Sequence, residues 1–130
     1  MTERVVCATE DLPPGSRVVV SVDRIEIGVF NIGGELVAIR NRCPHAGAPM
    51  CDGLLTGTVV SDGPQQRRWA HDGEILRCPW HGWEFKLPEG RSLVDPPYLL
   101  STYEVRVLDG QVLVDTASGR GTRTRAEART

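Results

Sequence analysis

Two short fragments of the sequence, CPHAGAPM and CPWHGW, limit what this chain can fold into more than any other feature. Each fragment has a proline directly after a cysteine and a histidine two or three positions beyond that cysteine. The pairs are Cys43 with His45 and Cys78 with His81. Because thiolates and imidazoles are both common metal ligands, the pattern predicts a fold that brings the two fragments together around one metal centre.

The spacing within each fragment suits a metal-binding loop. In an extended backbone, side chains two residues apart point to the same side, so Cys43 and His45 can reach one ion. The separation of Cys78 from His81 is typical of a metal-binding turn. Residues 46–77 lie between the fragments, which fits two loops at the ends of neighbouring hairpins that converge on one site.

Glycine and proline support the loop interpretation. Gly47 follows the first Cys-His pair and Gly82 follows the second. Metal-binding turns often need a positive φ, which glycine adopts without steric cost. Pro44 and Pro79 fix φ and remove a backbone donor, so they should stiffen each loop.

Two kinds of metal centre fit the four candidate ligands. A structural zinc ion accepts two thiolates and two imidazoles, but zinc sites usually take both cysteines from one segment and both histidines from the other. Here each fragment supplies one cysteine and one histidine. In a Rieske-type [2Fe-2S] centre, cysteines bind one iron and histidines bind the other. The mixed composition favours the two-iron cluster and leaves structural zinc as the alternative.

The composition is typical of one globular domain. The chain has 130 residues, of which 40% are hydrophobic and 25% are charged. No apolar run approaches the ~20 residues that span a bilayer. The N-terminal stretch lacks the apolar core and cleavage site of a signal peptide. We therefore expect a cytoplasmic protein with no membrane partner. Cys7 and Cys51 have no nearby histidine and are expected to be ordinary packing residues.

The charge is distributed unevenly along the chain. Residues 116–130 contain four arginines and one glutamate, which gives 4 − 1 = +3. Because the whole chain has a net charge of -2, residues 1–115 carry −2 − 3 = −5. The C-terminal segment is polar and lacks aromatic residues, so we expect residues 116–130 to be a disordered basic tail. The acidic body argues against nucleic-acid binding.

Strand signals dominate the rest of the chain, and helical periodicity is nowhere convincing. Runs that are rich in β-branched residues or that alternate strictly predict strands over 17–22, 24–32, 35–40, 74–78, 103–107 and 111–115. Residues 54–77 are expected to form a long hairpin with its turn in SDGPQQ. His71 is expected to lie at the surface in this segment. The sequence therefore predicts an all-β protein.

The sequence resembles the Rieske ferredoxin family. CPHAGAPMCDG and RCPWHGWEFKLPEGRSL are similar to the two halves of its cluster motif, and NIGGELVAIRNRCPH and TYEVRVLDGQVLV are similar to its flanking strands. The resemblance covers about residues 4–115. It implies an antiparallel β-sandwich base with an inserted cluster-binding subdomain at about residues 41–97, within a domain that spans residues 1–115.

Carried over by position, the resemblance implies roles for the four candidate ligands. Cys43 and Cys78 would bind the buried iron of one [2Fe-2S] cluster, and His45 and His81 would bind the iron nearer the surface. The segment Pro96-Pro97 matches the proline-containing loop that helps to cover the cluster in this family.

Residues beside the ligands indicate which branch of the family the chain resembles and which side chains could contact a partner protein. Respiratory-chain Rieske proteins have a disulfide beside the ligands, whereas Trp80 stands between Pro79 and His81 here, so Cys51 has no such partner. This difference points to the soluble ferredoxin branch. Trp80 and Met50 are candidates either for docking or for packing, and Trp83 is expected to pack under the loops.

The resemblance implies an electron carrier rather than an enzyme. An oxygenase of this family needs a further 2-His-1-carboxylate iron site, and no histidine follows His81. The first hypothesis is a carrier that passes one electron from a flavin-dependent reductase to a terminal oxygenase. The second is a small subunit of a nitrite reductase or another redox complex. The third is a zinc-stabilised interaction module.

Overall fold

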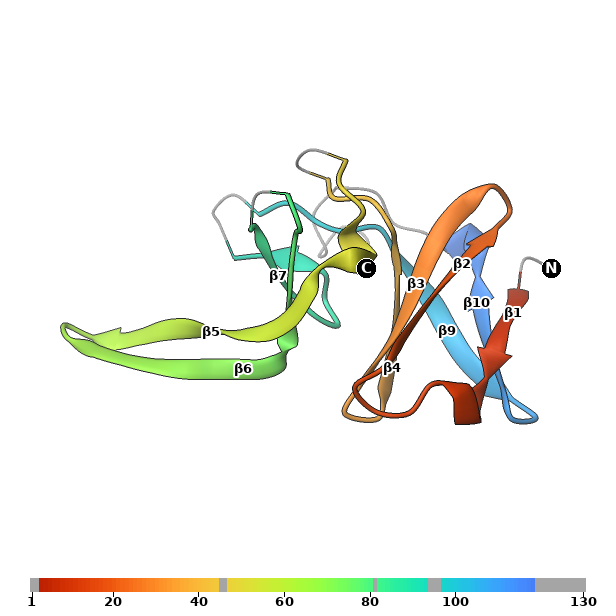
Figure 1. Ribbon diagram of the computed structural model, residues 1–130, viewed down its shortest axis with the longest axis horizontal. Helices are drawn as coiled ribbons and strands as arrows, with labels where there is room; N and C mark the ends of the chain where they lie inside the picture. The colour runs from red at the N-terminus through yellow and green to blue at the C-terminus, as the bar shows by residue number, and fades with distance from the viewer. Residues whose placement is uncertain (1–2, 45–46, 81, 94–96, 119–130) are drawn as a thin grey trace.

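The computed structural model describes residues 3–44, 47–80, 82–93 and 97–118 (Figure 1). These residues form strands and short 3-10 helices. The strands are β1 (Glu3–Ala8), β2 (Arg17–Val22), β3 (Ile25–Ile32), β4 (Glu35–Arg40), β5 (Leu54–Gly63), β6 (Gln66–Arg77), β7 (Glu84–Lys86), β8 (Arg91–Ser92), β9 (Thr102–Leu108) and β10 (Gln111–Asp115). The 3-10 helices are η1 (Thr9–Asp11), η2 (Met50–Asp52) and η3 (Thr116–Ser118). The expectation of an all-β fold is confirmed. Within the described residues, no helix is long and apolar enough to cross a membrane.

Six strands form an antiparallel sheet in the order β1-β10-β9-β4-β3-β2. Alternate side chains of these strands face one core, because successive residues of a strand point to opposite sides of the sheet. Val29 of β3 lies opposite Ala38 of β4, and both are buried. Arg4 of β1 contacts Asp23 in the turn after β2, with Nε and Oδ1 3.3 Å apart. This contact brings the two edges of the sheet close together.

The chain between β4 and β9 forms a second antiparallel sheet, in the order β5-β6-β7-β8. A second core lies between this sheet and the first. Phe30 and Ile39 enter this core from the six-stranded sheet, and Leu76 and Phe85 enter it from the other side. The chain between β4 and β9 therefore forms a separate sheet that packs on the six-stranded one.

The predicted hairpin over residues 54–77 is present as β5 and β6. Figure 1 shows this hairpin extending well away from the rest of the molecule. Thr56 pairs with Ile75 and Thr58 pairs with Ala70, so Gly57 lies opposite a bulge formed by residues 71–74. We call the ribbon beyond this bulge, residues 57–70, the distal arm. The strand predicted at 74–78 is the end of β6 and not a separate element.

The last strand of the first sheet, β10, is followed directly by a short helix. After β10, the described chain continues as η3 to Ser118. The Ser118 hydroxyl donates to the Asp115 carbonyl, at 2.6 Å, and accepts from the Glu104 N–H, at 2.8 Å. The structure thus extends three residues into the segment predicted as a tail, and residues 119–130 lie outside the described part.

Candidate metal centre

The two Cys-Pro fragments form loops with the same hydrogen-bond pattern. In the first loop, the Cys43 N–H donates to the Ala48 carbonyl, at 2.8 Å, and the Gly47 N–H donates to the Cys43 carbonyl, at 2.7 Å. In the second loop, the Cys78 N–H donates to the Trp83 carbonyl, at 2.8 Å, and the Gly82 N–H donates to the Cys78 carbonyl, at 3.0 Å. Each cysteine therefore bonds to the residues four and five positions further along. The similarity seen in the sequence is a similarity of backbone structure.

The glycine at the same position of each loop has a positive φ. Gly47 has φ +78° and Gly82 has φ +72°. Such values are easily reached only by glycine, so they are what allow each chain to turn back and donate to its cysteine. The prediction that these glycines serve the loop geometry is confirmed.

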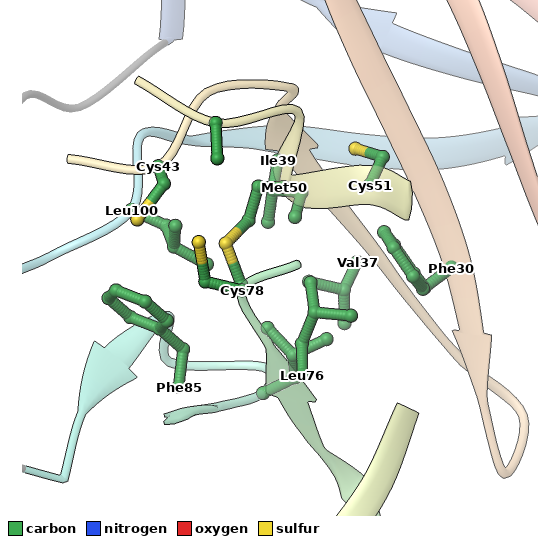
Figure 2. Close-up of a cluster of buried hydrophobic side chains, with 12 residues drawn as sticks. Phe30, Val37, Ile39, Cys43, Met50, Cys51, Leu76, Cys78, Phe85 and Leu100 are labelled. Carbon is green, nitrogen blue, oxygen red and sulfur yellow. The ribbon is translucent and has the colours of Figure 1, made fainter. Parts of the chain in front are cut away.

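Both loop cysteines are buried in the core shared by the two sheets. Cys43 is 0% exposed and Cys78 is 1% exposed. Figure 2 shows their sulfur atoms turned toward the same region between the loops, next to Met50, and the Cys51 sulfur apart from them. Cys43 follows the end of β4 and Cys78 follows β6, so one cysteine comes from each side of the core. The sequence prediction that two loops converge is correct for the two cysteines.

Two polar side chains, from Arg17 in β2 and from Asn41 just after β4, hold the segment that follows the first loop. Asn41 accepts the Cys51 N–H, at 2.7 Å, and donates its amide to Glu26, at 3.0 Å. Arg17 donates to the Cys51 carbonyl, at 2.9 Å, and to the Gly53 carbonyl, at 2.6 Å. These contacts satisfy backbone groups of η2 and its neighbours, which would otherwise be left without partners near the core. Sequence reasoning did not single out Arg17 or Asn41, because neither contact is local in the chain.

A third loop closes beside the second. Its base is held by Ser92, whose N–H donates to the Tyr98 carbonyl, at 2.9 Å, and by Tyr98, whose N–H donates to the Ser92 hydroxyl, at 2.8 Å. The Tyr98 ring packs edge-on against Trp83, with ring centroids 5.0 Å apart. This contact joins the loop that contains Pro97 to the second cysteine loop. Pro96, the other residue of the predicted proline segment, lies outside the described residues.

The two other cysteines differ from the loop cysteines in their surroundings. A Cβ built on Gly28 would lie 2.3 Å from the Cys51 sulfur, so Cys51 packs directly on the backbone of β3. Burial raises the pKa of the Cys51 thiol to about 12. A thiol of that kind stays protonated at neutral pH and is a poor metal ligand, because the ligand form is the thiolate. Burial also raises the pKa of Cys7, which lies in β1. Both positions agree with the predicted packing role.

The tryptophans and the methionine beside the loops differ in how deeply they are buried. Met50 is fully buried in the shared core, so its predicted docking role is wrong and its packing role is confirmed. Trp83 is partly buried against the same core, as expected. Trp80 is 58% exposed at the tip of the second loop, which leaves it accessible to another protein.

The donors that the structure describes fit the inner half of a two-iron cluster. Cys43 and Cys78 are both without a disulfide, both buried, and both directed into one apolar region. Two thiolates on one iron are what a Rieske-type centre requires there. His45 and His81, the other two predicted ligands, lie outside the described residues. Among the described residues, no three side chains of metal-binding type form a group that could hold an ion.

Comparison with known proteins agrees with this geometry. Residues 2–104 match the family model described as the Rieske [2Fe-2S] domain. The 3-phenylpropionate/cinnamic acid dioxygenase ferredoxin subunit of Shigella flexneri serotype 5b (strain 8401) is 33% identical over 113 residues. That alignment covers 84% of this chain and 89% of the relative. The corresponding subunit of Escherichia coli (strain K12) is 32% identical over the same shares.

Solved structures show the same architecture. The ferredoxin of carbazole 1,9a-dioxygenase from Nocardioides aromaticivorans IC177 superposes with a TM-score of 0.66 at 26% identity, covering 88% of this chain and 97% of that one. A chain from a complex of reduced oxygenase and oxidized ferredoxin in carbazole 1,9a-dioxygenase gives a TM-score of 0.70 at 25% identity, with coverage of 95% and 98%. A putative nitrite reductase NADPH (small subunit) protein gives 0.63 at 25% identity, with coverage of 88% and 98%.

Proposed function

This chain belongs to the Rieske [2Fe-2S] domain family, and on that premise we propose that Cys43, His45, Cys78 and His81 are the ligands of its cluster. In this assignment the two cysteines bind one iron and the two histidines bind the other. The observation that supports it best is the shared backbone pattern of the two loops, which places each cysteine in an equivalent, buried position. In the sequence, each histidine stands two or three positions after its cysteine.

The protein is an electron carrier, and the cluster supplies the one-electron chemistry when it is bound. The chain's own residues hold the two thiols in an apolar core that excludes water. Met50 and Phe85 pack in this core, and Asn41 and Arg17 fix the backbone beside it. A rigid setting of this kind limits the reorganisation that accompanies a change of charge at the site.

We place the protein between a flavin-dependent reductase and a terminal oxygenase. This proposal rests on the relatives, which are named as ferredoxin subunits of dioxygenases, and on the solved complex of an oxygenase with a ferredoxin. We further propose that the Rieske domain spans residues 1–118, three residues more than the sequence predicts, with its cluster-binding part at about residues 41–97, and that residues 119–130 serve as a basic tail. A cytoplasmic location remains a prediction from the sequence.

A second candidate is the small subunit of a nitrite reductase or another redox complex. The structural likeness to a putative nitrite reductase small subunit favours it. A carrier should be isolated alone and should exchange electrons with a separately purified reductase. A subunit should instead co-purify in a fixed ratio with a larger redox protein.

The ligand assignment can be tested by spectroscopy. The dithionite-reduced protein is expected to give the EPR spectrum of a Rieske-type cluster with two irons per chain. Cys43→Ser, His45→Ala, Cys78→Ser and His81→Ala should each abolish that spectrum, because each removes a ligand.

Two matched variants serve as controls for these changes. Cys7→Ser removes a cysteine and His71→Ala removes a histidine, and neither residue is an assigned ligand. Both variants should keep the iron content and the spectrum of the unmodified protein. A normal spectrum in any of the four ligand variants, or its loss in both controls, would contradict the assignment.

A further inference from the structure

The distal arm is a ribbon of only two strands. From Gly57 to Gly63 it extends about 20 Å, at the usual rise of a β-strand. Its base is oriented by two contacts. The Thr58 hydroxyl donates to Glu84, at 2.9 Å, and the Trp69 indole N–H donates to Asp72, at 3.1 Å. Two-stranded ribbons are only marginally stable in water, so a projecting arm with a fixed base is suited to pairing with something else.

Between its two irregularities in register, at Gly57 and between Ser61 and Gly63, the outer edge of β5 has no charge or proline to protect it. β5 is the terminal strand of its sheet, and no charged residue or proline occurs from Leu54 to Ser61. Natural edges are usually protected by charges, prolines or a covering element. The other strand of the arm, β6, has Arg67 and Arg68 at the corresponding place. The edges of the six-stranded sheet, in contrast, lie close to each other.

From this edge we propose that the β5 strand of the distal arm pairs, antiparallel and across a two-fold axis, with the same strand of a second copy of this chain. Such an axis places identical segments opposite each other. The uncharged run Thr58–Ser61 can meet itself without bringing like charges together. The same pairing through β6 would set Arg67 and Arg68 against their copies, and like charges directly opposite are destabilising.

The apolar side chains of the arm support this register. Val59 of β5 lies directly opposite Trp69 of β6, and the two side chains are 57% and 55% exposed. When the two-fold axis passes between the two copies of Val59, the pair extends into one row over four strands. The row runs from Trp69 through both valines to the Trp69 of the second copy. Aromatic and β-branched neighbours of this kind stabilise a sheet.

The Trp69 side chain of the arm is already held in one orientation in the single chain. The Trp69 ring lies over Gly57, where an added Cβ would be 2.8 Å from the indole. Together with the bond to Asp72, this packing holds the ring in one orientation, which lowers the entropic cost of association. About five residues per copy would pair, which makes a small interface. The dimer should therefore be weak and should form only as concentration rises.

The test is the oligomeric state of the cluster-loaded protein. Sedimentation velocity from about 5 to 500 µM should show a reversible monomer–dimer equilibrium. Val59→Lys places like charges on the two-fold axis, so it should weaken the dimer at least about tenfold. Val107→Lys is the matched control, because Val107 is a similarly exposed strand valine, at 50%, outside the arm. It should leave the equilibrium unchanged.

Amide hydrogen exchange identifies the surface involved. Backbone amides within Gly57–Ser61 should become more protected as concentration rises, and this effect should be absent from Val59→Lys. A protein that stays monomeric at 500 µM overturns the proposal and leaves the arm available to a different protein partner. A dimer that Val59→Lys does not weaken, or that leaves these amides unprotected, also overturns it.

Discussion

Gly28 is a single residue on which the packing behind the first cysteine loop depends. Its Cα faces the Cys51 sulfur, and a Cβ there would approach that sulfur to 2.3 Å. Gly28→Ala should therefore lower the free energy of unfolding by about 1–3 kcal/mol, the usual cost of overpacking a core. Chemical unfolding of the cluster-loaded protein, followed by circular dichroism, measures the change.

The double variant Gly28→Ala/Cys51→Ala is the control for this prediction. Removing the sulfur leaves room for the new methyl group, so the double variant should be more stable than Gly28→Ala alone. If the two variants were equally unstable, the contact between Gly28 and Cys51 would not be the cause of the loss.

At the same scale, the sequence could identify ligand candidates better than it could assign neighbouring side chains. Cys43 and Cys78 stand out because each belongs to a repeated pattern of cysteine, proline and histidine. Met50 and Trp80 both stand near the ligands in the sequence, yet Met50 is fully buried and Trp80 is exposed. Burial depends on which elements pack over a residue, and a single sequence does not contain that information directly.

Among the elements, strands of five or more residues with local partners can be predicted from the sequence, whereas a strand with only a distant partner and very short strands cannot. β2, β3 and β4 follow one another through short turns, and their β-branched runs are evident in the sequence. β1 was missed, because its partner β10 lies at the other end of the chain. β7 and β8 were missed because strands of two or three residues show no alternation that can be recognised.

The bulge in β6 shows a related limit. The Asp72-Gly73 pair is of a kind that is common in tight turns, where a positive φ is needed. His71 and Gly73 do have positive φ, at +57° and +77°. The chain nevertheless continues as one strand through this point, because β5 supplies pairing on both sides of the bulge. The local sequence thus allows a bend at these residues, and the pairing with β5 decides that the strand continues through it.

The short helix η3 allows a prediction about where the fold ends. A chain that stops after Ser118 keeps the hydrogen bonds of that residue to Asp115 and Glu104, so its stability should match the full chain. A chain that stops after Asp115 loses both bonds, which should lower the free energy of unfolding by about 1 kcal/mol. Thermal unfolding should then shift down by about 4 °C. Equal melting temperatures for the two truncated chains would place the end of the fold at β10.

At the scale of the whole molecule, the two sheets meet in one core, and the loop cysteines lie where they meet. Phe30 and Ile39 belong to the large sheet, while Leu76 and Phe85 belong to the small one. Neither sheet alone could bury the two cysteines, so the site exists only when both are folded. The distal arm takes no part in this core, and Figure 1 shows it directed away from the six-stranded sheet.

The molecule therefore presents two exposed tryptophans in different settings, and they should have different roles. Trp80, 58% exposed, lies on the second cysteine loop, whereas Trp69, 55% exposed, lies on the distal arm. Electron exchange requires a partner to approach the cysteine loops, and exposed tryptophans often dominate the binding energy of small interfaces. Trp80→Ala should thus leave the EPR spectrum unchanged but slow reduction by the proposed flavin-dependent reductase about tenfold.

Trp69→Ala removes an equally exposed ring from the arm and provides the matched comparison. Stopped-flow reduction at low micromolar concentration, where the proposed dimer is dissociated, should give this variant the rate of the unmodified protein. If the two substitutions slowed reduction equally, the arm would belong to the electron-transfer surface. If neither did, the reductase would approach the cysteine loops from another side, and Tyr98, also exposed and in contact with Trp83, would be the next residue to change.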